Sequence, residues 1–135
     1  MGRKTYFGIP ESKRPLPGRL NVVLTSEKEK YNFPPEVVVV SSMVEALNEI
    51  QSENVHNKIE NVWIVGGHSV YKETMDSPHC YRIYFTKIMA TFDCDAFFPQ
   101  IPDNFELVPN DDDIPCDIQE ENGIKYQYQT YEKTK

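Results

Sequence analysis

The fold is decided by the stretch Val62-Trp63-Ile64-Val65-Gly66-Gly67-His68-Ser69-Val70-Tyr71. Its first four residues form an apolar run rich in branched side chains, which predicts a buried strand ending at Val65. The two glycines then provide a turn without side chains, and the residues after Gly67 predict a helix that continues through Met75. Strand, glycine turn and helix in this order are typical of an α/β protein.

Two further strands are predicted upstream of this stretch. The first covers Arg19–Ser26 (RLNVVLTS) and the second Val37–Val40, which is apolar on both faces and therefore expected to be buried on both. Ser41 or Ser42 is placed to cap the helix that follows, and Glu45 stands in its first turn. These segments extend the α/β pattern toward the N-terminal side.

Three strands in succession are predicted downstream, at Ile83–Met89, Phe105–Val108 and Ile124–Tyr131. The last of them alternates apolar or aromatic residues with Lys and Gln, as an antiparallel strand with one wet face would. Alternating strands and helices followed by consecutive strands indicate an α/β sheet with an antiparallel C-terminal end.

Length and composition narrow the class of protein. The 135 residues favour one domain, and 12 Val and 10 Ile against 5 Leu and 3 Ala favour strands over a helical bundle. A net charge of −7 argues against a nucleic-acid or anionic-membrane surface. Cys80, Cys94 and Cys116 are scattered, as is typical of reduced thiols in the cytosol, and the His and Cys spacing predicts no metal site.

Two segments have the residue types that bind phosphate. Gly66-Gly67 precedes a helix whose first N–H groups point toward the turn, although two glycines at a strand end are also compatible with a simple tight turn. Gly2-Arg3-Lys4-Thr5 combines two cations with a hydroxyl. This segment is either an anion site or a frayed basic terminus.

Arg19 follows the rigid turn Pro15–Gly18 and opens a predicted strand. An arginine fixed there would bind a carboxylate with both arms of its guanidinium, and the alternative is a surface arginine lying over Leu16. Thr86 is expected in the middle of a strand, where a buried hydroxyl needs a hydrogen-bond partner, which the backbone alone would also provide.

Several segments in a fixed order characterise the whole chain: Met1–Thr5, Ile9–Glu11, Arg14–Leu16, Gly18–Leu24, Val62–Gly67, Ser69–Glu73, Asp95–Pro99 and Gly123–Tyr126. Taken together, these segments resemble dihydrofolate reductase of the animal type. The resemblance implies one domain over residues 1–135, with a mixed, mostly parallel central sheet and flanking helices. It also implies NADPH-dependent reduction of 7,8-dihydrofolate, in support of one-carbon metabolism, by a cytoplasmic and usually monomeric enzyme.

The resemblance assigns roles residue by residue. Those implied to contact NADPH are Arg3, Lys4, Thr5, Leu24, Thr25, Ser26, Glu27, Gly66, Gly67, His68, Ser69, Val70, Tyr71, Lys72 and Glu73. Those implied to contact the substrate are Ile9, Pro10, Leu16, Arg19, Val65, Tyr71 and Thr86. Within this scheme Thr86 tethers the catalytic carboxylate, and the peptide bond between Gly66 and Gly67 is cis.

The chain departs from the family pattern in two respects. Ser26 and Ser41 stand where vertebrate members usually have arginines for the 2′-phosphate of the cofactor, so the preference for NADPH over NADH is expected to be softer, and His68 replaces a usual Ser or Ala. The resemblance also places the first strand, a closing loop and the first helix, with its acidic proton donor, upstream of Met1. The expectation is an N-terminally truncated chain with no catalytic acid and negligible turnover by itself.

Two other functions remain open at this point. One is a non-catalytic product that keeps an NADPH-binding or partner-binding surface. The other is a nicotinamide-dependent reductase of the same fold that acts on a different heterocycle, for which the Arg19 carboxylate site would be accidental.

Overall fold

The structure is a computed structural model that describes residues 1–52 and 58–134. It divides into two compact units, Met1–Tyr71 and Lys72–Lys135. One contains a parallel pair of strands and the other an antiparallel sheet, so the predicted α/β class with an antiparallel C-terminal end is confirmed. Within the described residues, parallel pairing is confined to the first unit.

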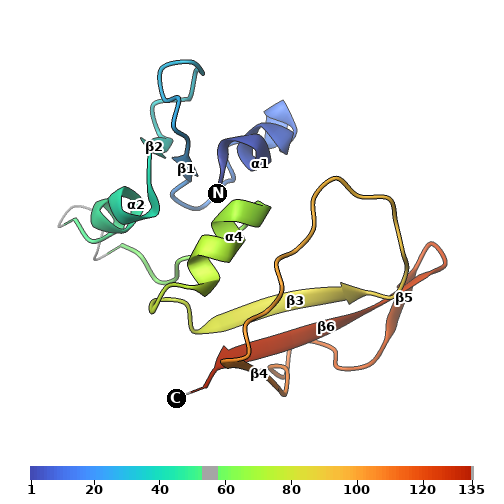
Figure 1. Ribbon diagram of the computed structural model, residues 1–135. Coiled ribbons are helices and arrows are strands. Elements are labelled where there is room, and N and C mark those ends of the chain that lie inside the picture. The colour runs from blue at the N-terminus through green and yellow to red at the C-terminus, as the bar shows by residue number, and fades with distance from the viewer. Residues whose placement is uncertain (53–57, 135) are drawn as a thin grey trace. The chain divides into compact units, whose positions relative to one another are not determined.

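The first unit is built on two short parallel strands, β1 (Val22–Leu24) and β2 (Val38–Val40), which pair in the register Val23↔Val39. Its helices are α1 (Arg3–Gly8), the single-turn 3-10 helix η1 (Glu11–Lys13) and α2 (Met43–Ile50), while α4 (His68–Met75) begins in this unit (Figure 1). The core cluster gathers around Met1, Tyr6, Val23 and Val37. Burial of these apolar side chains is the main stabilising term of the unit.

The strands of this unit are shorter than the sequence predicted. Strand β1 covers only Val22–Leu24 of the expected Arg19–Ser26, because Leu16 and Arg19 bond to the side chain of Asn21 instead of extending a ladder. At its other end, the backbone turns where the N–H of Glu27 bonds to the hydroxyl of Thr25. The expected burial of Val37–Val40 on both faces holds only in part, since Val38 and Val39 are half-buried.

The predicted strand at Val62–Val65 is wrong for this structure. Residues 61–67 have no regular secondary structure, and Val62 and Trp63 are 55% and 62% exposed. A strand exists only where neighbouring backbone completes its hydrogen-bond ladder, and no described strand pairs with this segment. An apolar run therefore gives the correct residue types but does not by itself provide a partner.

Helix α2 begins as predicted. The hydroxyl of Ser42 accepts a hydrogen bond of 3.1 Å from the backbone N–H of Glu45, which identifies Ser42 rather than Ser41 as the cap. The carboxylate of Glu45 reaches back to Ser41, where it accepts bonds from the backbone N–H and the hydroxyl, both at 2.8 Å. This arrangement is close to a capping box shifted by one residue.

The second unit is an antiparallel sheet in the order β3-β6-β4, with β5 also paired to β6 (Figure 1). Its strands are β3 (Arg82–Ile88), β4 (Phe105–Val108), β5 (Gln119–Glu121) and β6 (Ile124–Lys133). The three strands predicted here are confirmed. The turn between β5 and β6 has positive φ at Asn122 (51°) and Gly123 (76°), the geometry of a two-residue type I′ hairpin.

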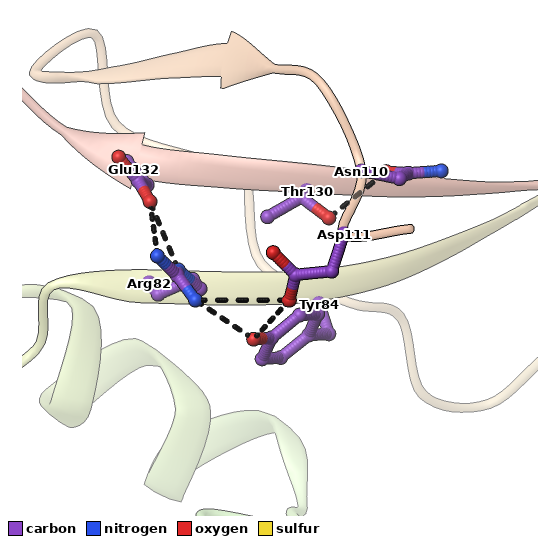
Figure 2. Close-up of polar contacts among 6 residues, drawn as sticks. All are labelled: Arg82, Tyr84, Asn110, Asp111, Thr130 and Glu132. Atoms are coloured by element: carbon purple, nitrogen blue, oxygen red, sulfur yellow. Dashed lines mark hydrogen bonds and ion pairs between the residues drawn. The ribbon is translucent and has the colours of Figure 1, made fainter. Parts of the chain in front are cut away.

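Polar side chains cross the sheet of the second unit. Figure 2 shows Arg82 donating to Glu132 and to the hydroxyl of Tyr84, with Asp111 3.9 Å away. The hydrogen bonds that Arg82 donates to Tyr84 and Glu132 raise the pKa of its guanidinium. Beside them the buried hydroxyl of Thr130 donates to the side chain of Asn110 at 2.9 Å (Figure 2).

Among the described residues, no helix has the length and apolar character needed to cross a lipid bilayer.

Candidate functional site

The backbone at Met1 and Gly2 joins two segments that are far apart in the sequence. The N–H of Leu24 bonds to the carbonyl of Met1 at 2.9 Å, and Gly2 forms a parallel bridge with Leu24. The N–H of Gly2 donates to the carbonyl of Gly66 at 2.8 Å. The end of β1, the start of α1 and the glycine turn therefore meet around one residue.

The glycine turn has little room for side chains. The peptide bond between Gly66 and Gly67 is cis, as the family resemblance implied, and Gly66 has φ of +109°. A Cβ placed on Gly66 would come within 3.3 Å of the ring of Tyr71, and one on Gly67 within 3.4 Å of the hydroxyl of Thr5. Glycine at these positions avoids both contacts, and the backbone of Gly67, which is half-buried, stays partly open to a ligand.

Helix α4 continues directly from this turn, since the N–H of Tyr71 bonds to the carbonyl of Gly67. Val70 is buried beside Gly2, and burial raises the pKa of Tyr71. The remaining residues of the helix that were predicted to contact cofactor are exposed, namely His68, Ser69, Lys72 and Glu73. The first turn of α4 thus presents backbone N–H groups and polar side chains to solvent.

Cationic side chains accompany the start of α1. The guanidinium of Arg3 lies 4.4 Å from the centre of the Tyr31 ring, a cation–π contact that holds it against the loop after β1. Lys4 is exposed, and Thr5 faces Gly67 as described above. The predicted basic segment is therefore a helix start rather than a frayed terminus.

The ends of β1 and β2 form a second part of the site, because parallel strands place their carboxyl ends at one edge. Thr25 is buried and its N–H bonds to the carbonyl of Val40 at 2.9 Å, while Ser26 is exposed. At this edge Lys28 pairs with Glu45 at 2.8 Å. Hydrogen bonds from Lys28 and Ser41 lower the pKa of Glu45 to about 2.

Lys28 was missed by the sequence reasoning. It lies in a polar run with no periodicity, so only its ion pair with a residue 17 positions away identifies it. Glu45 was expected at the start of the helix, but its bonds to Ser41 were not. Together, Lys28 and Glu45 place a cation and an anion at the strand edge that also carries Ser26 and Ser41.

The residues predicted to surround the substrate tail also come together in part. Ile9 and Leu16 both pack against the core cluster of the first unit, and Arg14, which sequence reasoning missed, donates to the carbonyl of Ile9 at 2.7 Å. Arg19 is exposed and its Nε donates to the carbonyl of Pro17 at 2.9 Å. The segment 9–19 therefore combines an apolar wall, formed by Ile9 and Leu16, with the exposed side chain of Arg19.

Three other residues that were predicted to contact the substrate are exposed or lie in the other unit. Pro10 and Val65 are exposed, and Thr86 lies on β3 in the second unit. The expectation that Thr86 is buried is wrong, because its position on the strand is open to solvent. The described residues contain no group of three His, Cys, Asp or Glu side chains that could hold a metal ion.

Comparisons with known proteins agree on one family. A family model described as dihydrofolate reductase matches residues 1–133. The dihydrofolate reductase of Aedes albopictus is 62% identical over 133 residues, which cover 98% of this chain and 72% of the relative, and that of Bos taurus is 46% identical over 136 residues, covering 98% and 71%. The solved structure of Schistosoma mansoni dihydrofolate reductase has a TM-score of 0.84 and 36% identity, and covers 98% of this chain and 72% of that one.

Proposed function

The chain belongs to the dihydrofolate reductase family, and from this premise we propose that it binds NADPH and reduces 7,8-dihydrofolate to 5,6,7,8-tetrahydrofolate by hydride transfer. We propose further that residues 1–135 act as one domain in the cytoplasm, a reducing compartment in which the three free cysteines would stay reduced. The observation that carries the proposal is the meeting of Leu24, Gly2 and Gly66, which joins the three segments expected to contact cofactor.

The residues present fit a dinucleotide. A Cβ on Gly66 or Gly67 would crowd Tyr71 or Thr5, so glycine at both positions lets the turn pack closely, and the half-buried backbone of Gly67 would approach a pyrophosphate. The backbone N–H groups at the start of α4, with Thr5, Arg3 and Lys4, would hold the phosphates. When bound, NADPH supplies the hydride, and the protein contributes binding, orientation and exclusion of water.

The strand ends would hold the adenosine end of the cofactor. Leu24 ends β1, Thr25, Ser26 and Glu27 follow it directly, and Arg3 lies against Tyr31 in the same loop. Because serines replace two usual arginines, Arg3 and Thr25, with Lys28 as a further cation, are left to select the 2′-phosphate. We therefore expect a smaller preference for NADPH over NADH than an arginine clamp would give.

The substrate would lie against Ile9, Pro10 and Leu16, with Arg19 on its tail carboxylate and Val65 and Tyr71 near the ring system. In the family scheme, the part of Thr86 would be to tether the catalytic carboxylate. None of these residues is acidic. Reduction requires a proton on the imine nitrogen, and losing general acid catalysis lowers a rate by roughly 10²–10⁴-fold. We accordingly propose that the 135-residue chain by itself turns over slowly even where it binds both ligands.

Calorimetry with NADPH and folate, followed by an assay of NADPH oxidation with dihydrofolate, tests the proposal. The expected result is saturable binding of both compounds and turnover far below that of the related animal enzymes. Absence of binding for both would overturn the proposed function. Binding with near-normal turnover would overturn only the expectation of a slow reaction.

Substitution of Arg19→Ala separates folate reduction from reduction of another heterocycle. If Arg19 binds the tail carboxylate, the variant loses affinity for folate and keeps its affinity for NADPH. An equal loss for both ligands would argue against the tail site.

A further inference from the structure

Asn21 has a buried side chain whose polar atoms all bond to one loop. It is 4% exposed, and its Oδ1 accepts from the backbone N–H of Leu16 at 2.9 Å. Its Nδ2 donates to the carbonyl of Leu16 at 2.9 Å and to that of Arg19 at 3.2 Å. A single amide therefore binds both backbone groups of Leu16 and closes the loop from Leu16 to Arg19.

The backbone of Asn21 is fixed independently of this loop. Its carbonyl accepts from the N–H of Val38 at 2.9 Å, and Val22, the next residue, starts β1. Asn21 thus connects the parallel strand pair to the loop. Because an amide has both a donor and an acceptor, it can satisfy an N–H and two carbonyls at once, which neither Asp nor Leu can do.

The loop held in this way carries the exposed Arg19 at its end. Its Nε donates to the carbonyl of Pro17 at 2.9 Å, which folds the guanidinium back over the loop. No acceptor among the described residues bonds to Nη1 or Nη2 of Arg19. An arginine with these two nitrogens available matches the geometry of a carboxylate.

We propose that Asn21 is the positioning residue for the tail site of the substrate: it holds the backbone of Leu16 and Arg19 so that the wall and the guanidinium bind the tail together. The inference rests on the proposed function, since it takes the tail carboxylate as the ligand of Arg19. Asn21 itself contacts no substrate in this scheme and acts through Arg19 and Leu16.

The test compares ligands with and without a tail. The chain is titrated calorimetrically with folate, with 6-methylpterin, which lacks the tail, and with NADPH. Asn21→Leu is expected to weaken folate binding about tenfold or more and to leave the other two affinities unchanged. In an Arg19→Ala background, Asn21→Leu should cause little further loss, because the two residues act as one unit.

Val23→Ala serves as the matched control. Val23 is fully buried in β1 and its truncation lowers stability without touching the loop, so its folate affinity should remain normal. Loss of affinity for folate and 6-methylpterin alike in Asn21→Leu would overturn the inference, and so would normal folate binding. A wild-type chain that binds neither NADPH nor folate would overturn the proposed function and this role with it.

A measurement on the unliganded wild-type chain covers the case in which Asn21→Leu does not fold. Nitrogen relaxation of the Arg19 side-chain Nε–H by NMR should show an ordered group, and the Leu16 amide should exchange slowly with solvent. A disordered Arg19 side chain or a rapidly exchanging Leu16 amide would overturn the positioning role without bearing on cofactor binding.

Discussion

The two units of the molecule differ in the backbone contacts that stabilise each of them internally. In Lys72–Lys135, β3 and β6 pair over seven consecutive positions, and β4 and β5 add further rungs on β6. In Met1–Tyr71, the strands are three residues long, and separate segments are joined by single bonds such as Gly2 to Gly66. The unit that contains most of the proposed site is therefore the one with the least regular backbone.

This difference has consequences for substitutions. In a strand ladder many backbone hydrogen bonds contribute to stability, so replacing one side chain leaves these backbone bonds in place. The contacts of the first unit are specific to single atoms, and a change at one of them removes the whole junction. We expect substitutions at the junctions of the first unit to affect ligand binding as well as stability, and substitutions in the second unit to affect stability alone.

The largest effect is expected for Gly66→Ala. With φ of +109° and the Tyr71 ring 3.3 Å from the new Cβ, the substitution should cost about 1–3 kcal/mol of unfolding free energy and weaken NADPH binding about tenfold or more. Urea unfolding and cofactor titration measure the two quantities. Gly8→Ala is the control, because nothing lies within 4 Å of its Cβ, and equal behaviour of the two variants would refute the crowded turn.

The next effect is expected in the second unit for Thr130→Val. Thr130 is 2% exposed, and its loss leaves the Oδ1 of Asn110 without its 2.9 Å donor, at a cost of about 1–3 kcal/mol. Affinity for NADPH should not change. Thr134→Val, whose hydroxyl bonds to Asn104 at the surface, is the control and should cost little, and reduced NADPH affinity in Thr130→Val would contradict the separation of roles.

Most of the second unit could be predicted from the sequence, and the reason is physical. Alternation in Ile124–Tyr131 predicts a strand, although most residues on both of its faces are half-buried, and Asn122-Gly123 supplies the positive φ values that a tight hairpin requires. These signals are local, so they survive without knowledge of the partner strands. Helix α2 was predictable for the same reason, since Ser42 and Glu45 are three residues apart.

The first unit was less predictable because its structure depends on distant partners. The apolar run Val62–Val65 has strand composition but forms no strand, and nothing in the sequence shows that Gly2 reaches Gly66. The roles of Asn21 and Lys28 could not be predicted from the sequence, because they depend on the residues to which these side chains bond. Residue types suggested the phosphate-binding segments, but their meeting required the structure.

A smaller, pH-dependent effect is expected at the edge of the parallel strands. The pKa of Glu45 is lowered from 4.5 to about 2 in the folded chain, so its ionised form stabilises the fold above pH 4.5 and this contribution is lost as pH falls toward about 2. The difference between the acid unfolding curves of wild type and Glu45→Gln isolates this residue. A constant difference across that range would contradict the lowered pKa.

The smallest effect is expected for Arg82→Gln. Its partners Glu132, Tyr84 and Asp111 are at the surface, where ion pairs contribute little because water and salt screen them. The urea midpoint should shift less than in Thr130→Val. A shift as large as that of Thr130→Val would show that this network, rather than the ladder, stabilises the second unit.

The most direct measurement is a two-dimensional ¹H–¹⁵N NMR titration of the chain with NADPH. The central claim is that three segments distant in sequence form one cofactor site around Gly2. It predicts saturable shifts at Arg3–Thr5, Leu24–Glu27 and Gly66–Val70 with one common dissociation constant, and unchanged signals in β4 and the β5–β6 hairpin. Shifts confined to one of the three segments, or a spectrum that does not respond to NADPH, would contradict it.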